Sequence, residues 1–328
     1  MSLPELTRCP GTLKEGHSTF SPAARNRLFG GHAVHHVLPY PSPATDADVD
    51  ARFTDNRRHM SISGVQEKLS IVLEKNKLRL AREGERGSHI LKPIPNAGRH
   101  RDQMPANEHV SMQIARQVFG IETAENALIF FQDGAPAYIT KRFDRREDGT
   151  KWAQEDFAAL DGRTPQTHGT DFKYVGNYLD LFRLLERFVP AYPVEAPKLF
   201  KRILFNYLIS NGDAHIKNFS LLQTPMGDFK LSPAYDLLNS RLHIDDTDFA
   251  LHGGLLPPAL AKGRVGEQFR VLAEEAHIPS KVVDRLFGEL PGKSAHVVQM
   301  VGASFLELST QRNFLQSYQT RVKRLLRA

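Results

Sequence analysis

The sequence contains one cysteine, Cys9, and one tryptophan among its 328 residues. A single cysteine excludes an intramolecular disulfide and suits a reducing compartment. No apolar run approaches the roughly 20 residues that a membrane-spanning helix needs. The first residues also lack the basic-then-apolar order of a signal peptide. Zinc-finger spacing and an aromatic-rich RNA-binding signature are absent too. These absences predict a cytoplasmic protein with no membrane contact, and they leave direct nucleic-acid binding as a minor alternative.

The composition is that of an ordinary globular protein, with 41% hydrophobic and 24% charged residues. The length allows two lobes and a sizeable core. The net charge of +6 suits a protein that binds nucleotide phosphates or an acidic partner. The basic residues are scattered except in the tail, residues 321–327, which we expect to form the solvated face of a last helix.

One stretch carries the pattern of a catalytic loop, an acidic residue followed after four residues by an asparagine: Asn211-Gly212-Asp213-Ala214-His215-Ile216-Lys217-Asn218. In kinases the Asp accepts the proton of the attacking hydroxyl, and the Asn oxygen holds a magnesium ion. Two short strands are expected next, around a turn at 224–228, and their hairpin would bring Asn218 to Asp236. The sequence thus predicts Asp213 as the base, and Asn218 and Asp236 as the metal ligands.

Lys217 and His215 are further catalytic candidates within this loop. Lys217 could stabilise charge on the transferring phosphoryl group, and His215 could orient the loop or hydrogen-bond Asp213. Another interpretation fits the same residues, because Asn, Gly and Asp favour turns that end helices. In that case Lys217 is a solvated lysine and His215 a structural histidine. So short a motif leaves both interpretations open.

From residue 57 the chain supplies further parts in the order that kinases use. A small, polar loop with one glycine precedes two apolar runs, 69–73 and 78–80, which predict a β-hairpin. In kinases such a loop covers the nucleotide phosphates, because small residues let backbone N–H groups approach them. The candidate nucleotide-binding residues of this loop are Ser61, Ile62, Ser63, Gly64, Gln66 and Lys68.

Lys92 and Glu108 form the next candidate pair. Lys92 lies in a short apolar strand over 89–92, and Glu108 opens a predicted helix with Asn107 as its N-cap. A strand lysine that contacts the phosphates, steadied by a helix glutamate, is typical of kinases. The alternatives are a snorkelling edge lysine and a first-turn glutamate that the helix dipole favours.

The remaining pattern divides the chain into two main parts. A second hairpin, 127–131 with 137–144, leads into a charged segment where a hinge between lobes is expected. Beyond it helices are predicted over 178–188, 199–210, 265–276 and 280–290, and from about residue 304. The predicted fold is α+β and two-lobed like a protein kinase, with a β-rich N-lobe and a mainly helical C-lobe. Its predicted parts are a short N-terminal segment (1–56), the N-lobe (57–143) and the C-lobe (144–328).

Four motifs in this order resemble those of the HipA toxin kinases. They are Ser61-Ile62-Ser63-Gly64-Val65-Gln66-Glu67-Lys68, Lys141-Arg142-Phe143-Asp144-Arg145, Gln154-Glu155-Asp156-Phe157 and the catalytic loop 211–218. The resemblance spans about residues 57 to 320. It implies a bacterial serine/threonine kinase of a toxin–antitoxin system that uses ATP and Mg²⁺ and phosphorylates a protein, with aminoacyl-tRNA synthetases as the expected targets.

The resemblance also implies roles for individual residues. It gives Asp213, Asn218, Asp236 and Lys92 the roles described above. It places Arg142 and Phe143 at the adenine side of the hinge. It places Ser61 and Ser63 in a loop that these kinases autophosphorylate. A phosphate there would carry nearly two negative charges beside the nucleotide phosphates, so we expect it to weaken ATP binding.

About sixty residues precede the glycine-containing loop, where long HipA proteins carry an additional subdomain. The chain therefore resembles the short HipT type, whose missing piece is a separate small protein. The expected partners are a HipB-like DNA-binding antitoxin, a HipS-like small protein, or both, so that DNA is contacted only indirectly.

Two other functions remain open from the sequence. Antibiotic-type small-molecule kinases use a similar Asp-x4-Asn loop, although theirs usually has His-Gly before the Asp. An inactive kinase-fold module that binds an antitoxin–DNA complex is the non-enzymatic alternative. The presence of every base and metal residue argues against the inactive module.

Overall fold

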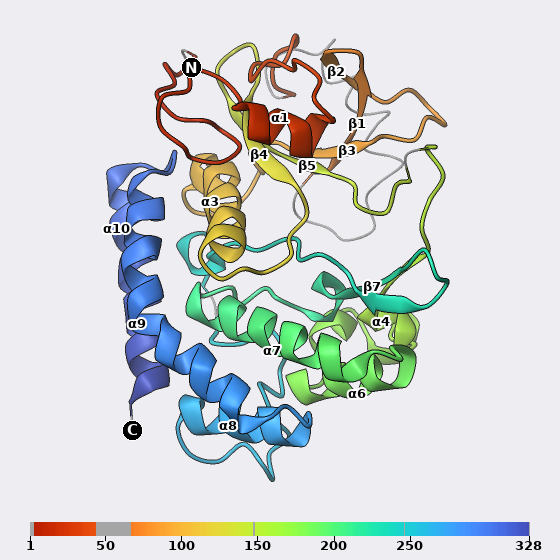
Figure 1. Ribbon diagram of the computed structural model, residues 1–328, viewed down its shortest axis with the longest axis vertical. Helices are drawn as coiled ribbons and strands as arrows, with labels where there is room; N and C mark the ends of the chain where they lie inside the picture. The colour runs from red at the N-terminus through yellow and green to blue at the C-terminus, as the bar shows by residue number, and fades with distance from the viewer. Residues whose placement is uncertain (1–2, 44–66, 147, 246, 328) are drawn as a thin grey trace. The chain divides into compact units, whose positions relative to one another are not determined.

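A computed structural model of the chain describes residues 3–43, 67–146, 148–245 and 247–327 (Figure 1). The chain forms two compact units. Unit 1 contains Met1–Gln113, Ala124–Phe143 and Met300–Thr310, and unit 2 contains Ile114–Thr123, Asp144–Gln299 and Gln311–Ala328. In the part of the chain that is described, none of the helices combines the length and hydropathy that a membrane span needs.

Unit 1 is built on a five-stranded antiparallel sheet with the order β2-β1-β3-β5-β4. The strands are β1 (Leu69–Glu74), β2 (Lys77–Leu80), β3 (His89–Lys92), β4 (Asn126–Phe130) and β5 (Pro136–Lys141). Both predicted hairpins form. Their tight turns use left-handed backbone at Lys75 and Gly134.

The N-terminal segment is part of unit 1 and covers one edge of this sheet. It forms helix α1 (Pro22–Phe29), whose N-cap Ser21 accepts a hydrogen bond from the Ala24 amide. Residues 36–40 then run beside β4 (Figure 1). The Leu38 amide donates to the Phe130 carbonyl, and the Phe130 amide donates to the His36 carbonyl. Unpaired strand edges are otherwise sites of unwanted pairing, so this cover protects β4.

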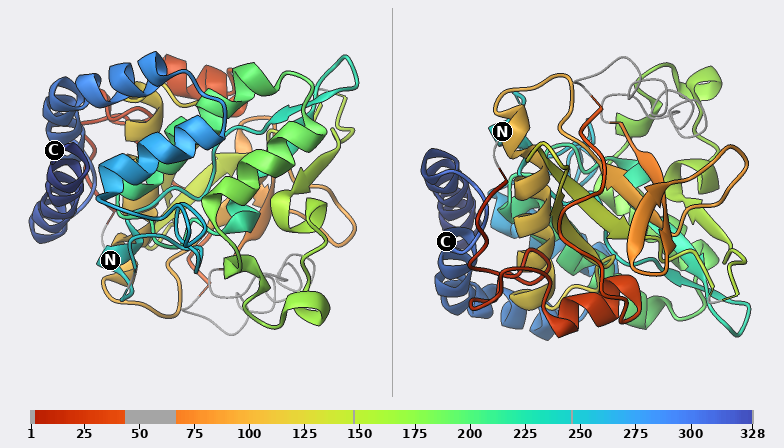
Figure 2. Two further views of the ribbon diagram at one scale, coloured as in Figure 1. Left: turned by 90° about the horizontal axis from the view of Figure 1, so that it is seen from below. Right: turned by 90° about the horizontal axis from the view of Figure 1, so that it is seen from above.

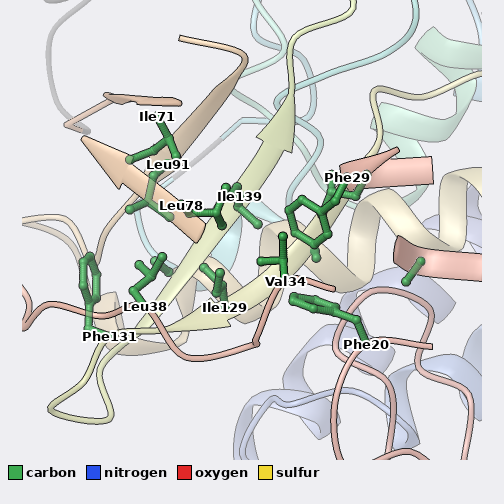
Figure 3. Close-up of a cluster of buried hydrophobic side chains, with 14 of the residues drawn as sticks. Phe20, Phe29, Val34, Leu38, Ile71, Leu78, Leu91, Ile129, Phe131 and Ile139 are labelled. Carbon is green, nitrogen blue, oxygen red and sulfur yellow. The ribbon is translucent and has the colours of Figure 1, made fainter. Parts of the chain in front are cut away.

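The hydrophobic core of unit 1 joins this segment to the sheet. Figure 3 shows Phe20, Phe29 and Val34 beside Ile129 and Ile139. Every one of these side chains is buried. Burial of large apolar side chains is the main favourable term in folding, so the segment contributes to the stability of the sheet.

Helix α3 (Met104–Gln117) starts four residues before Glu108, the predicted first residue. The 3₁₀ turn Arg101–Gln103 runs directly into it, and Pro105 lies in its first turn, where a missing N–H costs little. Asn107 is therefore not an N-cap. It is buried inside the helix, and its side-chain oxygen accepts a hydrogen bond from the Ser111 hydroxyl.

Unit 2 combines a small antiparallel sheet, in the order β6-β7-β8, with most of the helices. Its strands are β6 (Gln154–Asp156), β7 (Ser220–Gln223) and β8 (Phe229–Leu231). The β7–β8 hairpin is the one that the sequence predicts after the catalytic loop. The helices and 3₁₀ turns are α4 (Phe157–Leu160), α5 (Pro165–His168), η2 (Phe172–Tyr174), α6 (Tyr178–Phe188), α7 (Tyr192–Leu208), η3 (Ile216–Asn218), η4 (Ser240–Leu242), α8 (Val265–Glu275), α9 (Ser280–Gly302) and α10 (Leu308–Leu326). Of these, α6 and α7 pack side by side (Figure 2).

The last helix, α10, begins at Leu308 and not near residue 304. At α7 and α9 tertiary packing overrides the local signals. Helix α7 begins at Tyr192 and not at Leu199, with Pro197 inside it. Helix α9 continues past Leu290 and through Pro291. An internal proline removes one helical hydrogen bond. Buried side chains beyond it, such as Val297, favour continuation of α9.

The basic tail is only partly a solvated face. Lys323 and Arg324 of α10 are exposed, as predicted, whereas Arg321 is buried. Arg321 and Arg324 both form ion pairs with the Asp248 carboxylate. The expectation that Arg321 is solvated is wrong, because a carboxylate distant in sequence provides a buried guanidinium with a partner.

Candidate active site

The predicted catalytic loop follows α7 directly and is held by a residue distant in sequence. Ser210, two residues beyond the end of α7, has the left-handed conformation, with a φ of 58°. The Ser240 hydroxyl accepts a hydrogen bond from the Gly212 amide at 2.8 Å and donates one to the Ser210 carbonyl at 3.1 Å. Ser240 thus holds both sides of the turn that leads into Asp213.

Asp213 lies on the partly exposed side of this loop, where its carboxylate is oriented by a neighbour. The Tyr174 hydroxyl donates a hydrogen bond of 2.8 Å to Asp213 Oδ1. The Asp213 carbonyl accepts one of 2.7 Å from the His215 amide. A partly exposed carboxylate with a fixed orientation can accept a proton from a hydroxyl group that approaches it.

The two predicted metal ligands are brought together by the β7–β8 hairpin. Asn218 Nδ2 donates to Asp236 Oδ2 at 3.4 Å, and the Asp236 carbonyl accepts a hydrogen bond from Asn211. Asp236 has a left-handed φ of 54°. Such strain in a non-glycine residue costs on the order of 1–3 kcal/mol and is concentrated at functional sites.

The donor chemistry at this hairpin fits a magnesium ion. The side-chain oxygen of Asn218 is shielded from solvent and accepts no hydrogen bond from the described residues. A buried amide oxygen without a donor is costly, whereas amide and carboxylate oxygens are the ligands that suit a hard cation. The described residues contain no group of three or more His, Cys, Asp or Glu side chains that could hold a metal. An ion here would therefore depend on Asn218 and Asp236, with water or phosphate oxygens as its other ligands.

Lys217 forms an ion pair within unit 2. Its Nζ lies 2.6 Å from Asp156 Oδ2, and its carbonyl accepts a hydrogen bond from the Tyr235 hydroxyl. The other carboxylate oxygen of Asp156 caps helix α4 by accepting from the Ala159 amide. Asp156 therefore links the start of α4 to the catalytic loop.

His215 is buried in the same loop. Burial, the largest influence, lowers its pKa to about 4, so the ring is neutral near pH 7. The nearby Asp213 carboxylate only partly opposes this effect. The ring packs edge-on against Tyr174, with the two centroids 5.4 Å apart. This neutral, packed ring suits a structural role in the loop, which is one of the two roles considered for it.

Unit 1 carries the other predicted pair. Lys92 Nζ lies 2.6 Å from Glu108 Oε1, and the two side chains are only 5% and 2% exposed. The same ammonium group lies 5.4 Å from the centre of the Tyr138 ring. Strand β3 and helix α3 thus bring together the lysine and glutamate that the sequence pairs.

The other candidate residues belong to unit 1 or lie outside the described residues. Arg142 and Phe143 are the two residues after β5. The Arg142 amide donates a hydrogen bond to the Ser88 carbonyl at 2.9 Å. Lys68 immediately precedes β1. Five candidate residues of the predicted glycine-containing loop lie outside the described residues: Ser61, Ile62, Ser63, Gly64 and Gln66.

Sequence reasoning missed the partners of two charged side chains of the loop, Asp156 beside Lys217 and Tyr174 beside Asp213. An aspartate directly before the helix-forming run 157–160 is a typical N-cap, so the sequence could have predicted this role of Asp156. Its ion pair with Lys217 forms only in the folded chain. Tyr174 precedes Asp213 by 39 residues, and no local pattern links the two. Both contacts arise between segments that are far apart along the chain.

Residues 60–297 match the family model of the HipA-like C-terminal domain. Among curated proteins, the chain is 33% identical over 238 residues to "Putative kinase Y4dM" of Sinorhizobium fredii. It is 26% identical over 205 residues to the serine/threonine-protein kinase toxin HipA of Shewanella oneidensis. These alignments cover 68% and 58% of this chain. Since they cover 55% and 46% of the relatives, the chain spans about half the length of each.

Two solved structures share the fold. HipA in the Shewanella oneidensis complex with HipB and operator DNA gives a TM-score of 0.62 at 21% identity, over 88% of this chain and 74% of that one. The Helicobacter pylori proinflammatory kinase CtkA gives 0.51 at 11% identity, over 80% and 93%. The predicted α+β, kinase-like fold is thereby confirmed. The chain belongs to the HipA-like kinase family, as its four sequence motifs predict.

Proposed function

We propose that this chain is an ATP-dependent serine/threonine protein kinase that acts as the toxin of a bacterial toxin–antitoxin system. One observation carries the proposal. The loop that holds Asp213 also brings Asn218 to within 3.4 Å of Asp236. A proton acceptor followed by a carboxamide–carboxylate pair is the minimum that phosphoryl transfer requires of a kinase catalytic loop.

In the proposed reaction the side chains of unit 2 position the acceptor. Asp213 orients the serine hydroxyl and takes its proton as the oxygen attacks the γ-phosphorus of ATP. The bond from the γ-phosphorus to the β–γ bridging oxygen breaks, and ADP leaves. Asn218 and Asp236 would hold Mg²⁺, which supplies neutralisation of charge on the phosphates. Lys217 is the candidate for stabilising charge on the transferring group, and its ammonium group pairs with the partly exposed Asp156 carboxylate.

In unit 1 the proposal assigns Lys92 to the nucleotide phosphates, with Glu108 fixing its position. Arg142 and Phe143 are proposed to lie beside the adenine. Ser61 and Ser63 remain proposed autophosphorylation sites, and their phosphorylation is proposed to weaken ATP binding by charge repulsion.

The partners are proposed from the relatives. HipA of Shewanella oneidensis is found in a complex with HipB and operator DNA, which supports an antitoxin of the HipB kind for this chain. A HipS-like small protein is the other candidate. An aminoacyl-tRNA synthetase is the proposed substrate, since the HipA resemblance of the sequence motifs implies it.

The test begins with purified protein incubated with Mg-ATP. Intact mass and phosphopeptide mapping then measure phosphate incorporated into the chain and into a panel of added synthetases. We expect Asp213→Ala to lower the rate roughly 10²- to 10⁴-fold, the usual contribution of a general base. Asp236→Ala should remove most of the activity as well. Asp284→Ala is the matched control, because Asp284 is an exposed carboxylate of α9 that pairs with Arg270.

Different failures have different meanings. Normal turnover by Asp213→Ala would overturn the assignment of the base. Phosphorylation of an aminoglycoside, with no phosphate on any protein, would favour a small-molecule kinase. No ATP turnover under any condition would favour an inactive binding module.

A further inference from the structure

Tyr174 reaches the proposed base from outside the catalytic loop. Its hydroxyl donates a 2.8 Å hydrogen bond to Asp213 Oδ1. Oδ2 of the same carboxylate receives no hydrogen bond from the described residues. One oxygen is therefore held, and the other remains able to accept a proton.

The Tyr174 ring is itself fixed by its neighbours. It stacks on His252 with ring centroids 6.0 Å apart and planes at 26°. It meets His215 edge-on at 5.4 Å. The His252 amide also donates to the Tyr174 carbonyl at 2.8 Å. A ring packed between two imidazoles has little rotational freedom, so its hydroxyl is directed at the carboxylate.

We infer that Tyr174 is a positioning residue that sets the orientation of the Asp213 carboxylate for proton transfer. This inference rests on the proposed kinase function. A carboxylate that accepts no hydrogen bond can rotate about its last side-chain bond, and most of its orientations do not face the acceptor hydroxyl. A hydrogen bond to a charged oxygen is strong enough to select one orientation. Preorganisation of this kind raises the maximal rate and leaves nucleotide binding unchanged.

The chain contains a matched control for this contact. The Tyr178 hydroxyl donates a 2.8 Å hydrogen bond to the Ala214 carbonyl, in the same loop and one residue beyond Asp213. Tyr178 is buried and contacts the backbone of the loop, not the carboxylate of the base. Tyr178→Phe therefore removes a hydroxyl that supports the loop and leaves the contact to Asp213 in place.

The experiment measures the initial rate of phosphate incorporation into the full chain over a range of Mg-ATP concentrations. Tyr174→Phe should lower the maximal rate roughly 10- to 100-fold, the loss expected when a hydrogen bond to a charged group is removed. Its KM for ATP and its thermal midpoint should stay at the original values. His252→Ala, which removes one side of the ring packing, should give a smaller loss in the same parameter.

A double-mutant cycle with Asp213→Asn separates positioning from general structural support. If Tyr174 acts through the charged carboxylate, Y174F should cause little further loss in the D213N background. Tyr178→Phe should lower the rate by the same factor in both backgrounds.

Four results would overturn the inference. They are an equal loss from Y174F in both backgrounds, a raised KM for ATP with an unchanged maximal rate, a faster reaction, and phosphate mapped onto Tyr174 itself. The third would mean that the phenol competes with the acceptor, and the fourth that it is the acceptor. If the unaltered chain incorporates no phosphate and transfers none to any synthetase, the proposed function fails and the inference fails with it.

Discussion

Two lysine–carboxylate pairs in this protein have the same length and very different surroundings. Lys92 and Glu108 in unit 1 are 2.6 Å apart, with side chains 5% and 2% exposed. Lys217 and Asp156 in unit 2 are also 2.6 Å apart, but their side chains are 29% and 25% exposed. Distance alone would rank the two pairs as equal.

Burial makes the two pairs energetically different. Charges removed from water depend on each other, so loss of one partner leaves an uncompensated buried charge. Partly exposed charges keep much of their hydration, and such pairs contribute little to stability. The pair in unit 1 should therefore matter for folding, whereas Lys217 can change partner at little cost. A lysine that interacts with a transferring phosphoryl group needs that freedom.

The largest effect is expected for Lys92→Met. This change removes one buried charge and takes the Lys92 ammonium group away from the buried Glu108 carboxylate, so we expect a loss of about 3–5 kcal/mol in unfolding free energy. Urea unfolding followed by circular dichroism measures it. If the unfolding free energy of Lys92→Met lies within about 1 kcal/mol of that of the unaltered protein, burial does not make this pair more important for stability than the exposed one.

The next effect is acid destabilisation of unit 1, to which His89 contributes. Burial, the largest cause, lowers the pKa of His89 to about 4, and the Leu28 carbonyl only partly offsets this. The unfolded chain binds a proton near pH 6.5 that the folded chain does not, so stability falls as the pH drops from about 6.5 towards 4. The loss from this one group approaches about 3 kcal/mol.

Urea unfolding at pH 7 and at pH 4.5 tests this effect. His89→Gln should show a smaller drop between the two pH values, because the glutamine does not titrate. His36 and His109 also lie in unit 1, and burial is the largest cause that lowers their pKa, to about 4 and about 3. Part of the acid sensitivity should therefore survive the substitution. An identical drop in the variant would contradict the role given to His89.

The smallest effect on stability is expected for Lys217→Met, the counterpart of Lys92→Met. The unfolding free energy should change by less than about 1 kcal/mol. Phosphate incorporation from Mg-ATP should fall more than this stability change explains, because the variant lacks the proposed charge near the phosphoryl group. If Lys217→Met is stable and fully active, Lys217 has no role in the proposed site. If it loses several kcal/mol of unfolding free energy, the exposed pair is as important for folding as the buried one.

Local patterns predicted the elements that depend on neighbours along the chain. The hairpins of β1–β2, β4–β5 and β7–β8 follow from short apolar runs around turns that contain Gly, Asn or Asp. The order of strand lysine, helix glutamate and catalytic loop was also visible in the sequence. Each of these signals lies within a few residues of the element that it predicts.

The elements that the sequence misjudged depend on distant partners. Asn107 is a good N-cap residue by type, yet the helix starts earlier and buries it. Arg321 belongs to a basic tail, yet Asp248 pairs with it in the interior. Helix α9 continues through Pro291. In each case packing outweighs a local preference worth a few kcal/mol at most.

The sequence by itself determined the order of the elements, the family and the residues of the loop from Asp213 to Asn218. Residue type and short spacing carry that information. Only the tertiary structure decided that Asp156 pairs with Lys217 and that the Tyr174 hydroxyl meets Asp213. It also decided that, of two ion pairs of equal length, the one in unit 1 is buried. The physical reason is that burial and side-chain contacts between distant segments exist only once the chain has folded.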